Sequence, residues 1–203
     1  MPLYFDTDGA PENEAIDLTQ LKTHLRLGDI TDHDTELAFL ISALADKSQV
    51  DSPLQFYFKR QLLTATLVFT FSVFKYKLEI PRPPLVSITT FEYRDTAGNW
   101  QTVNASNYEE NSKKEPGFIK FDSDYSVPDV YEDEEHPFRI TFVAGYGATH
   151  SNIPANIKLW AMNVIADYWT IKNGQVMTNF SLVELKSSMG RIAAPHLAGR
   201  RFG

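Results

Sequence analysis

AGYGATHSNIPANIKLWAMNVIADYW, residues 144–169, joins two glycines to the most regular apolar repeat in the chain. The apolar side chains of its second half recur at helical spacing: Ile157, Trp160, Ala161, Val164, Ile165, Tyr168 and Trp169. This repeat predicts an amphipathic helix over residues 154–172, with Pro154 near its start and Asn173-Gly174 as its stop. Ser151 or Asn152 precedes the proline and is a suitable first residue.

The glycines of this stretch could in principle cradle a phosphate. Such a loop needs a lysine followed by serine or threonine, or a third glycine at the dinucleotide spacing, and this stretch has neither. We therefore expect Gly145 and Gly147 to turn the chain sharply from a strand into the helix, with positive φ at one of them or both.

Upstream of the glycines the apolar period is two, which predicts strands in the region 61–146. Alternation runs from Leu63 to Val73, and FRITFVAGY repeats it before the glycines. LVSITTFEYRDTAGNWQTV predicts two strands joined at residues 95–99, and GFIKF a further strand. Together these patterns predict an antiparallel sheet that contains a hairpin.

The N-terminal part predicts helices within residues 19–59, after a flexible leader over residues 1–15. IDLTQLKTHLRL suits a short helix capped by Thr19, and Asp34 is a candidate cap for the next helix. Pro53 breaks that helix, and Asp51 or Ser52 could cap a fresh turn. The fold class expected is α+β, with N-terminal helices, an antiparallel β insertion and a C-terminal helix.

Charge is unevenly distributed along the sequence, whose net charge is −7. Residues 109–135 hold ten acids against three lysines, which favours a solvated loop. The acids lack the spacing of a calcium loop, so we expect no metal and no cofactor. The tail, residues 185–203, has no acid, and we expect it to be flexible and to bind a partner through its four basic residues: Lys186, Arg191, Arg200 and Arg201.

Composition excludes several further classes. The 203 residues include no cysteine, so disulfide frameworks and thiolate metal sites are excluded. The longest apolar run, residues 62–74, is shorter than the ~20 residues that span a bilayer, and the first residues lack the features of a signal peptide. A net negative charge argues against a protein that grips nucleic acid through phosphates.

No pattern of catalytic residues is evident, and we expect no enzyme. Two alternatives stay open at this point. A small hydrolase could place His150 with Asp167 or Glu184 near a pocket, and a nucleic-acid-binding accessory protein could use the basic tail with exposed aromatics.

The order of six segments resembles the head-to-tail connector, or adaptor, proteins of tailed bacteriophages, in the longer variant with a hairpin-bearing β insertion. The segments are IDLTQLKTHLRLGD, DHDTELAFLISAL, RQLLTATLVFTF, LEIPRPPLVSITTFEYRDTAGNWQTV, FRITFVAGYG and IPANIKLWAMNVIADYW. They cover residues 16–169, within a single connector-like domain expected over residues 16–184.

The resemblance implies a structural virion protein that assembles in the host cytoplasm. Such proteins form a closed ring, expected to be dodecameric, in the neck of the virion. The ring lies between the portal and the tail-completion or stopper protein, and genomic DNA passes through its channel without specific binding. No membrane is involved.

Overall fold

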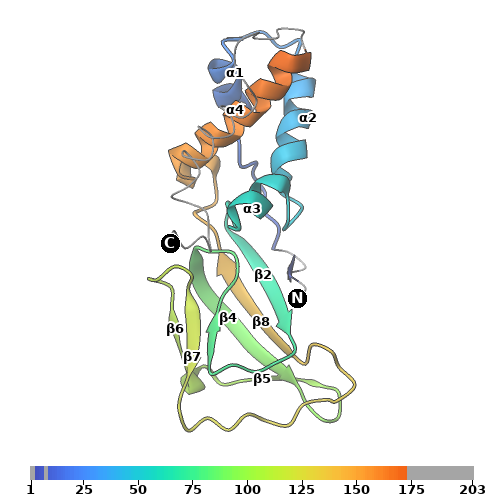
Figure 1. The fold of residues 1–203 in the computed structure, drawn as a ribbon, viewed down its shortest axis with the longest axis vertical. Coiled ribbons are helices and arrows are strands. Elements are labelled where there is room, and N and C mark those ends of the chain that lie inside the picture. Colours follow the sequence, from blue (N-terminus) through green and yellow to red (C-terminus); the bar gives the residue numbers. More distant parts are fainter. Residues whose placement is uncertain (1–2, 7–8, 173–203) are drawn as a thin grey trace. The chain divides into compact units, whose positions relative to one another are not determined.

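The computed structural model describes residues 3–6 and 9–172 of the chain. These residues form two compact units. The β unit consists of Thr64–Tyr146 with the described residues up to Pro11, and the helical unit consists of Glu12–Leu63 with the described residues from Gly147 onward. The sequence predicts one domain over residues 16–184, whereas the chain crosses three times between two separately packed parts (Figure 1).

The larger sheet of the β unit has five strands in the order β1-β2-β8-β4-β5, all antiparallel. Its strands are β1 (Leu3–Phe5), β2 (Ala65–Phe71), β4 (Leu85–Arg94), β5 (Trp100–Thr102) and β8 (Phe138–Ala144). The predicted antiparallel sheet and hairpin are confirmed, and Gly98 turns the hairpin with φ of 83°. β1 lies inside the leader that was predicted to be flexible, because pairing with β2 orders it.

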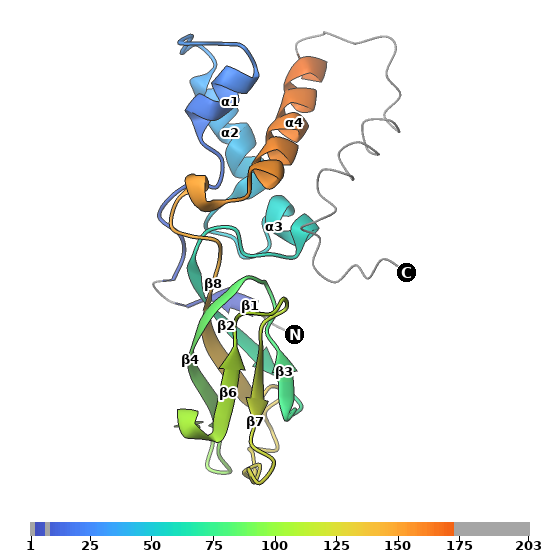
Figure 2. The same ribbon diagram turned by 90° about the vertical axis from the view of Figure 1, so that its left-hand side faces the viewer.

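A smaller sheet packs beside it, in the order β3-β7-β6 (Figure 2). It contains β3 (Lys77–Glu79), β6 (Tyr108–Asn111) and β7 (Phe118–Phe121), and the short helix η1 (Ala105–Asn107) leads into β6. Only β7 was predicted. The solvated loop predicted for residues 109–135 is therefore wrong for residues 109–111 and 118–121, which pair with each other as strands. It describes residues 122–135, which form no strand.

Aromatic rings fill the core of the β unit. Phe71, Phe91 and Phe121 are at most 2% exposed, and the Phe91 and Phe121 centroids are 5.0 Å apart. Phe138 stacks on Phe71 at 5.5 Å. Alternate residues of β8 point into this core, which is why its sequence alternates.

The helical unit contains α1 (Leu18–His24), α2 (Asp34–Ala45), α3 (Pro53–Phe58), η2 (His150–Asn152) and α4 (Ala155–Lys172). Two predicted caps are wrong by one or two residues. Asp17, not Thr19, caps α1 by accepting a hydrogen bond from the Gln20 backbone N–H at 2.8 Å. His33 occupies the cap position of α2, and Asp34 is its first residue.

Pro53 opens α3 directly after Ser52, as the sequence predicts. The first intrahelical acceptor of α4 is the Pro154 carbonyl, which receives the Ile157 N–H at 3.0 Å. The predicted stop at Asn173-Gly174 lies outside the described residues. None of the described helices has the length and apolarity needed to cross a membrane.

Candidate interaction surfaces

The turn before α4 contains two glycines and is held together by hydrogen bonds to the side chain of Asn152. Gly145 and Gly147 have φ angles of 130° and 156°, the positive values that the sequence predicts for at least one of them. A Cβ on Gly147 would overlap the Asn152 side chain. Asn152 in turn accepts hydrogen bonds from the Thr149 backbone N–H at 3.3 Å and hydroxyl at 3.1 Å. The glycine is therefore required for the turn itself.

His150 follows this turn as the first residue of η2, and the hydrolase alternative pairs it with Asp167. Asp167 lies twelve residues beyond Ala155, the first residue of α4, which is about 18 Å along a helix at 1.5 Å per residue. Its pKa is raised by burial alone, with no contribution from a histidine. The structure does not bring His150 and Asp167 together, and Glu184 lies outside the described residues.

α4 is held in the helical unit by aromatic and polar contacts on its inner side. Trp160, only 8% exposed, stacks on Tyr57 at 4.5 Å and meets Phe58 edge-on at 5.4 Å. Further along, Asn163 hydrogen-bonds His24 at 3.1 Å, and Trp169 packs against His33 at 4.9 Å. These aromatics belong to a core and are not arranged as an open stacking platform.

The acidic loop, residues 122–135, is tethered near both ends to the β unit. Tyr125 packs on Phe121 at 4.9 Å, and the Tyr125 carbonyl accepts a hydrogen bond from the Tyr76 hydroxyl at 3.0 Å. At the other end Arg94 forms an ion pair with Glu134, and the Arg94 carbonyl accepts the Tyr131 N–H at 3.1 Å. The loop is thus a positioned surface.

The tethers leave most carboxylates of the acidic loop in solvent. The exposed acids are Asp122, Asp124, Asp129, Glu132, Asp133 and Glu135. Basic residues are absent from this segment. The loop therefore presents a negative surface to whatever faces it.

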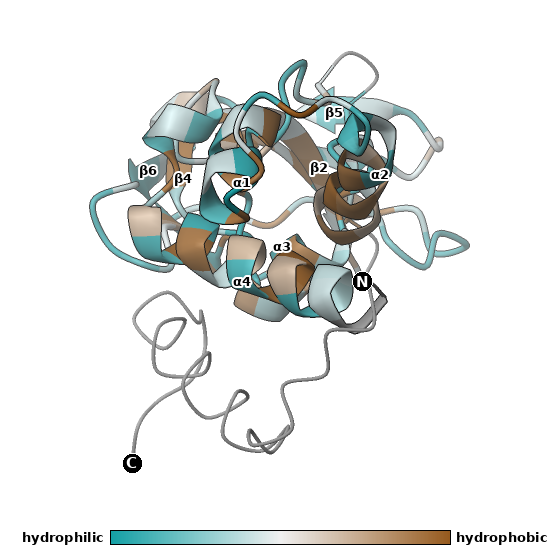
Figure 3. Cartoon of the chain, turned by 90° about the horizontal axis from the view of Figure 1, so that it is seen from above, coloured by the Kyte–Doolittle hydropathy of each residue, from teal (hydrophilic) through white to brown (hydrophobic). Residues whose placement is uncertain are grey.

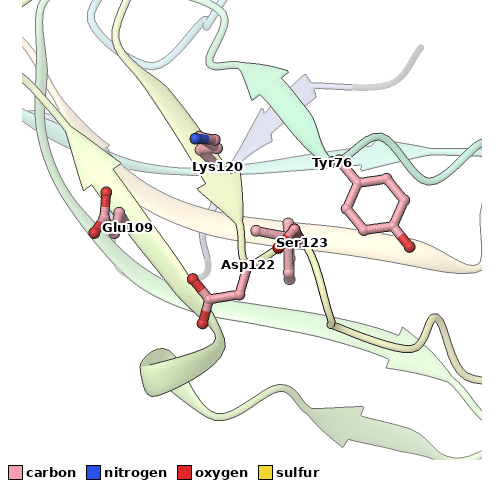
Figure 4. Close-up of a pocket in the computed structure, with 6 residues that line it drawn as sticks. Tyr76, Glu109, Lys120, Asp122 and Ser123 are labelled. Atoms are coloured by element: carbon pink, nitrogen blue, oxygen red, sulfur yellow. The ribbon is translucent and has the colours of Figure 1, made fainter.

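A hollow of about 490 Å³ lies beside this loop on the smaller sheet. Figure 4 shows its lining, which includes Tyr76, Glu109, Lys120, Asp122 and Ser123. Lys120 pairs across the strands with Glu109. The lining combines one lysine with two carboxylates, without a buried titratable group or a nucleophile next to a base, and it does not form a catalytic arrangement.

No group of three or more potential ligands for a metal ion occurs among the described residues. The predicted partner-binding residues Lys186, Arg191, Arg200 and Arg201 lie outside them, so their role stays a prediction. What the described structure offers for function is surface: the acidic loop of the β unit and the outward faces of the helical unit.

Comparison with solved structures finds the same fold over the whole chain. A chain in the neck of an empty gene transfer agent particle, computed with sixfold symmetry, matches with a TM-score of 0.73 and 18% identity, covering 100% of this chain and 98% of that one. A chain in the virion of the native gene transfer agent particle matches with a TM-score of 0.72 at 18% identity and the same coverage.

A third match is a chain in the neck of the native particle computed with twelvefold symmetry, with a TM-score of 0.68, 16% identity, and coverage of 100% and 98%. No protein-family model matches the chain, and no curated protein matches it. The chain therefore has the α+β fold of gene transfer agent neck components from end to end.

Proposed function

We propose that the protein is a structural head-to-tail connector that forms a closed ring in the neck of a virion, between the portal and a tail-completion or stopper protein. The observation that carries the proposal is the match to neck chains over 100% of this chain and 98% of theirs. The match takes in both the β unit and the helical unit of the chain.

A structural role agrees with the chemistry of the described residues. The hydrolase alternative needs His150 beside a carboxylate. His150 precedes α4, whereas Asp167 lies about 18 Å along that helix from its first residue. A ring works through repeated contacts between copies and needs no nucleophile or titrating pair. By analogy with the twelvefold neck, we propose twelve copies per ring.

The charge of the acidic loop supports the proposal that DNA passes through the channel without binding to its wall. Exposed carboxylates repel phosphates, so a ring that turns Asp122–Glu135 segments toward its axis would weaken DNA binding. We expect the purified protein to show no salt-sensitive binding to double-stranded DNA in an electrophoretic assay. Binding that weakens steeply with salt would instead favour the nucleic-acid-binding alternative.

Electron microscopy of the purified protein, alone and with its candidate portal, tests the proposal directly. We expect closed rings, or portals capped at one end by an additional ring, and portal imaged alone is the control. We propose that the protein joins the virion in the host cytoplasm during assembly. The ring could close before or upon binding to the portal, so both samples are imaged. If neither rings nor capped portals form at high protein concentration, the proposed function is refuted.

A further inference from the structure

The acidic loop has few apolar side chains with which to pack. Seven of its fourteen residues, 122–135, are Asp or Glu. α2, by contrast, carries hydrophobic residues over much of its length (Figure 3) and is held by burying one side of them. A loop whose carboxylates stay in solvent needs specific polar contacts to keep one position. The residues that make those contacts therefore decide whether the carboxylates are fixed.

The contacts of residues 126–136 converge on Arg94, the last residue of β4. Its guanidinium forms an ion pair with Glu134 and lies 5.7 Å from the centre of the Tyr131 ring. Its carbonyl accepts the Tyr131 N–H at 3.1 Å. Within the described part of the chain, these are the only hydrogen bonds, ion pairs and ring contacts that join residues 126–136 to the rest of the molecule. One residue thus makes all the specific contacts of this half of the loop.

The hairpin turn fixes the side chain of Arg94. Nε of Arg94 donates a hydrogen bond to the Gly98 carbonyl at 2.8 Å, while Nη1 donates to the Glu134 carboxylate. The turn itself is closed by the Asp95 carboxylate, which accepts the Asn99 N–H at 2.9 Å. The planar guanidinium has its donors in a fixed arrangement, so a side chain already ordered by the turn is oriented for the loop as well.

Arg139 of β8 lies on the same face of the sheet and provides a natural comparison. Arg139 pairs across the strands with Glu92, which is two residues before Arg94 and so points to the same side. It donates to the Glu92 carboxylate at 2.7 and 2.9 Å. The Arg139 and Arg94 side chains are 30% and 33% exposed. The two arginines are therefore alike in exposure and in having a glutamate partner, but the partner of Arg139 belongs to the sheet.

We infer that Arg94 is the positioning residue of the acidic loop. It holds residues 126–136 against the hairpin, and without it this segment opens while the sheets of the β unit stay folded. Opening of a segment with few specific contacts costs much less free energy than global unfolding. The first part of the loop stays attached, because Tyr125 packs on Phe121 and its carbonyl accepts the Tyr76 hydroxyl.

The purpose of this positioning rests on the proposed function, in which the acidic loop faces the DNA channel. A loop held in place keeps its negative potential at one part of the channel wall. The ion pair has a second effect, because Glu134 neutralises a guanidinium that would otherwise bind phosphate. Arg94 thus fixes the repelling carboxylates and is itself kept from attracting DNA.

Limited proteolysis of the full-length protein with a glutamyl endopeptidase tests the inference. Cleavage after Glu132 or Glu135 requires the loop to open, whereas cleavage after Glu92, inside β4, requires the sheet to unfold. We expect Arg94→Met to speed the initial cleavage of the loop about tenfold, the factor expected for one charge-assisted hydrogen bond, and to leave cleavage after Glu92 unchanged. Arg94→Lys keeps the charge without the fork and should give an intermediate rate. Arg139→Met is the matched control and should not speed cleavage of the loop.

Mass spectrometry of the fragments assigns each cleavage site, so the outcomes can be told apart. Loop cleavage that is no faster in Arg94→Met than in the natural chain overturns the inference. So does acceleration that appears equally after Glu92, since Arg94 would then support only the general stability of the β unit. Equal acceleration by Arg139→Met has the same consequence. The assay uses the free protein and needs no ring, so either result leaves the electron microscopy test of the proposed function independent.

Discussion

At Gly147 the backbone has no room for a side chain. Its φ of 156° lies in the range that favours glycine, and a Cβ would overlap Asn152. Gly98, with φ of 83°, has nothing within 4 Å of such a Cβ. We expect Gly147→Ala to lower the free energy of unfolding by more than about 1 kcal/mol, and by more than Gly98→Ala does. Urea unfolding of both variants measures the difference, and equal losses would contradict the steric argument.

Trp160 is the residue on which α4 depends. Its ring is 8% exposed between Tyr57 and Phe58. Trp160→Ala should cost about 3–5 kcal/mol, as expected for a large buried aromatic side chain. Trp160→Phe keeps a ring in the stack and should cost less. Thermal melts of the two variants check this, and an alanine variant that melts like the natural chain would show that the ring is dispensable.

Asp167 makes stability depend on pH. Burial raises the pKa of its carboxyl above the ordinary value of 3.8, so the folded chain binds more protons than the unfolded chain in the range above that value. The free energy of unfolding therefore falls as pH rises through this range.

Asp167→Asn avoids this loss because the amide is neutral at every pH. We expect the variant to melt at a higher temperature than the natural chain at pH 7, with the gap closing as pH falls toward 3.8. A gap at Asp167 that widened on acidification would show the opposite sign and refute the argument.

At the scale of the elements, substitutions at the start of α1 test whether Asp17 or Thr19 caps the helix. Asp17 accepts the Gln20 N–H at 2.8 Å, so Asp17→Ala should cost about 1 kcal/mol, the usual value for an N-cap. Thr19 lies inside the helix, and Thr19→Ala should not lower stability, because alanine has the higher helix propensity. Chemical unfolding of the two variants separates the caps, and a larger loss for Thr19→Ala would restore the cap predicted from the sequence.

Elements with strong local patterns could be predicted, and elements that depend on distant partners could not. α4, α3, β8 and the hairpin each carry a regular apolar period or a turn residue in their own sequence. β1 has three residues and exists because Leu3–Phe5 pair with β2, more than sixty positions later. The sequence of β6 was predicted as part of a charged loop, because it contains Glu109 and Glu110. Both side chains are exposed, and the segment becomes a strand by pairing with β7.

Beside its buried stripe, α2 has a second, exposed face that includes Phe39, and the sequence analysis did not identify it. Once Leu37, Leu40, Ile41 and Leu44 account for one buried stripe, the remaining positions are assumed to face solvent. These remaining positions carry no charge after the first turn. Exposure in the structure was needed to show that Phe39 is not buried within its own unit. The absence of charge on the second face is the signal that could have found it.

At the scale of the whole molecule, the division into two units could not be predicted. The chain passes between them at Pro11–Glu12, at Leu63–Thr64 and at Tyr146–Gly147, and only the last of these passages contains glycine. Contacts rather than composition define these boundaries, so a sequence of 203 residues reads as one domain. The fold class, by contrast, follows from the order of helices and strands and is confirmed.

The charge asymmetry of the whole chain leads to the last prediction. Residues 185–203 hold Lys186, Arg191, Arg200 and Arg201 without an acid, and we propose that they dock on a partner whose surface carries carboxylates. These residues lie outside the described structure. The portal and the adjacent copy are the candidate partners, and the acidic loop of an adjacent copy has the required charge.

A chain that ends at Glu184 tests the proposal. We expect it to fold with an unchanged melting temperature, because every packed contact described here precedes that residue, and to lose portal binding in a pull-down. A full-length variant with all four basic residues replaced by glutamine is the matched control for charge and should lose binding in the same way. Truncated protein that joins portals as efficiently as the full chain would show that the tail has no docking role. If the glutamine variant still binds, the contact is made by the apolar residues of the tail and not by its charges.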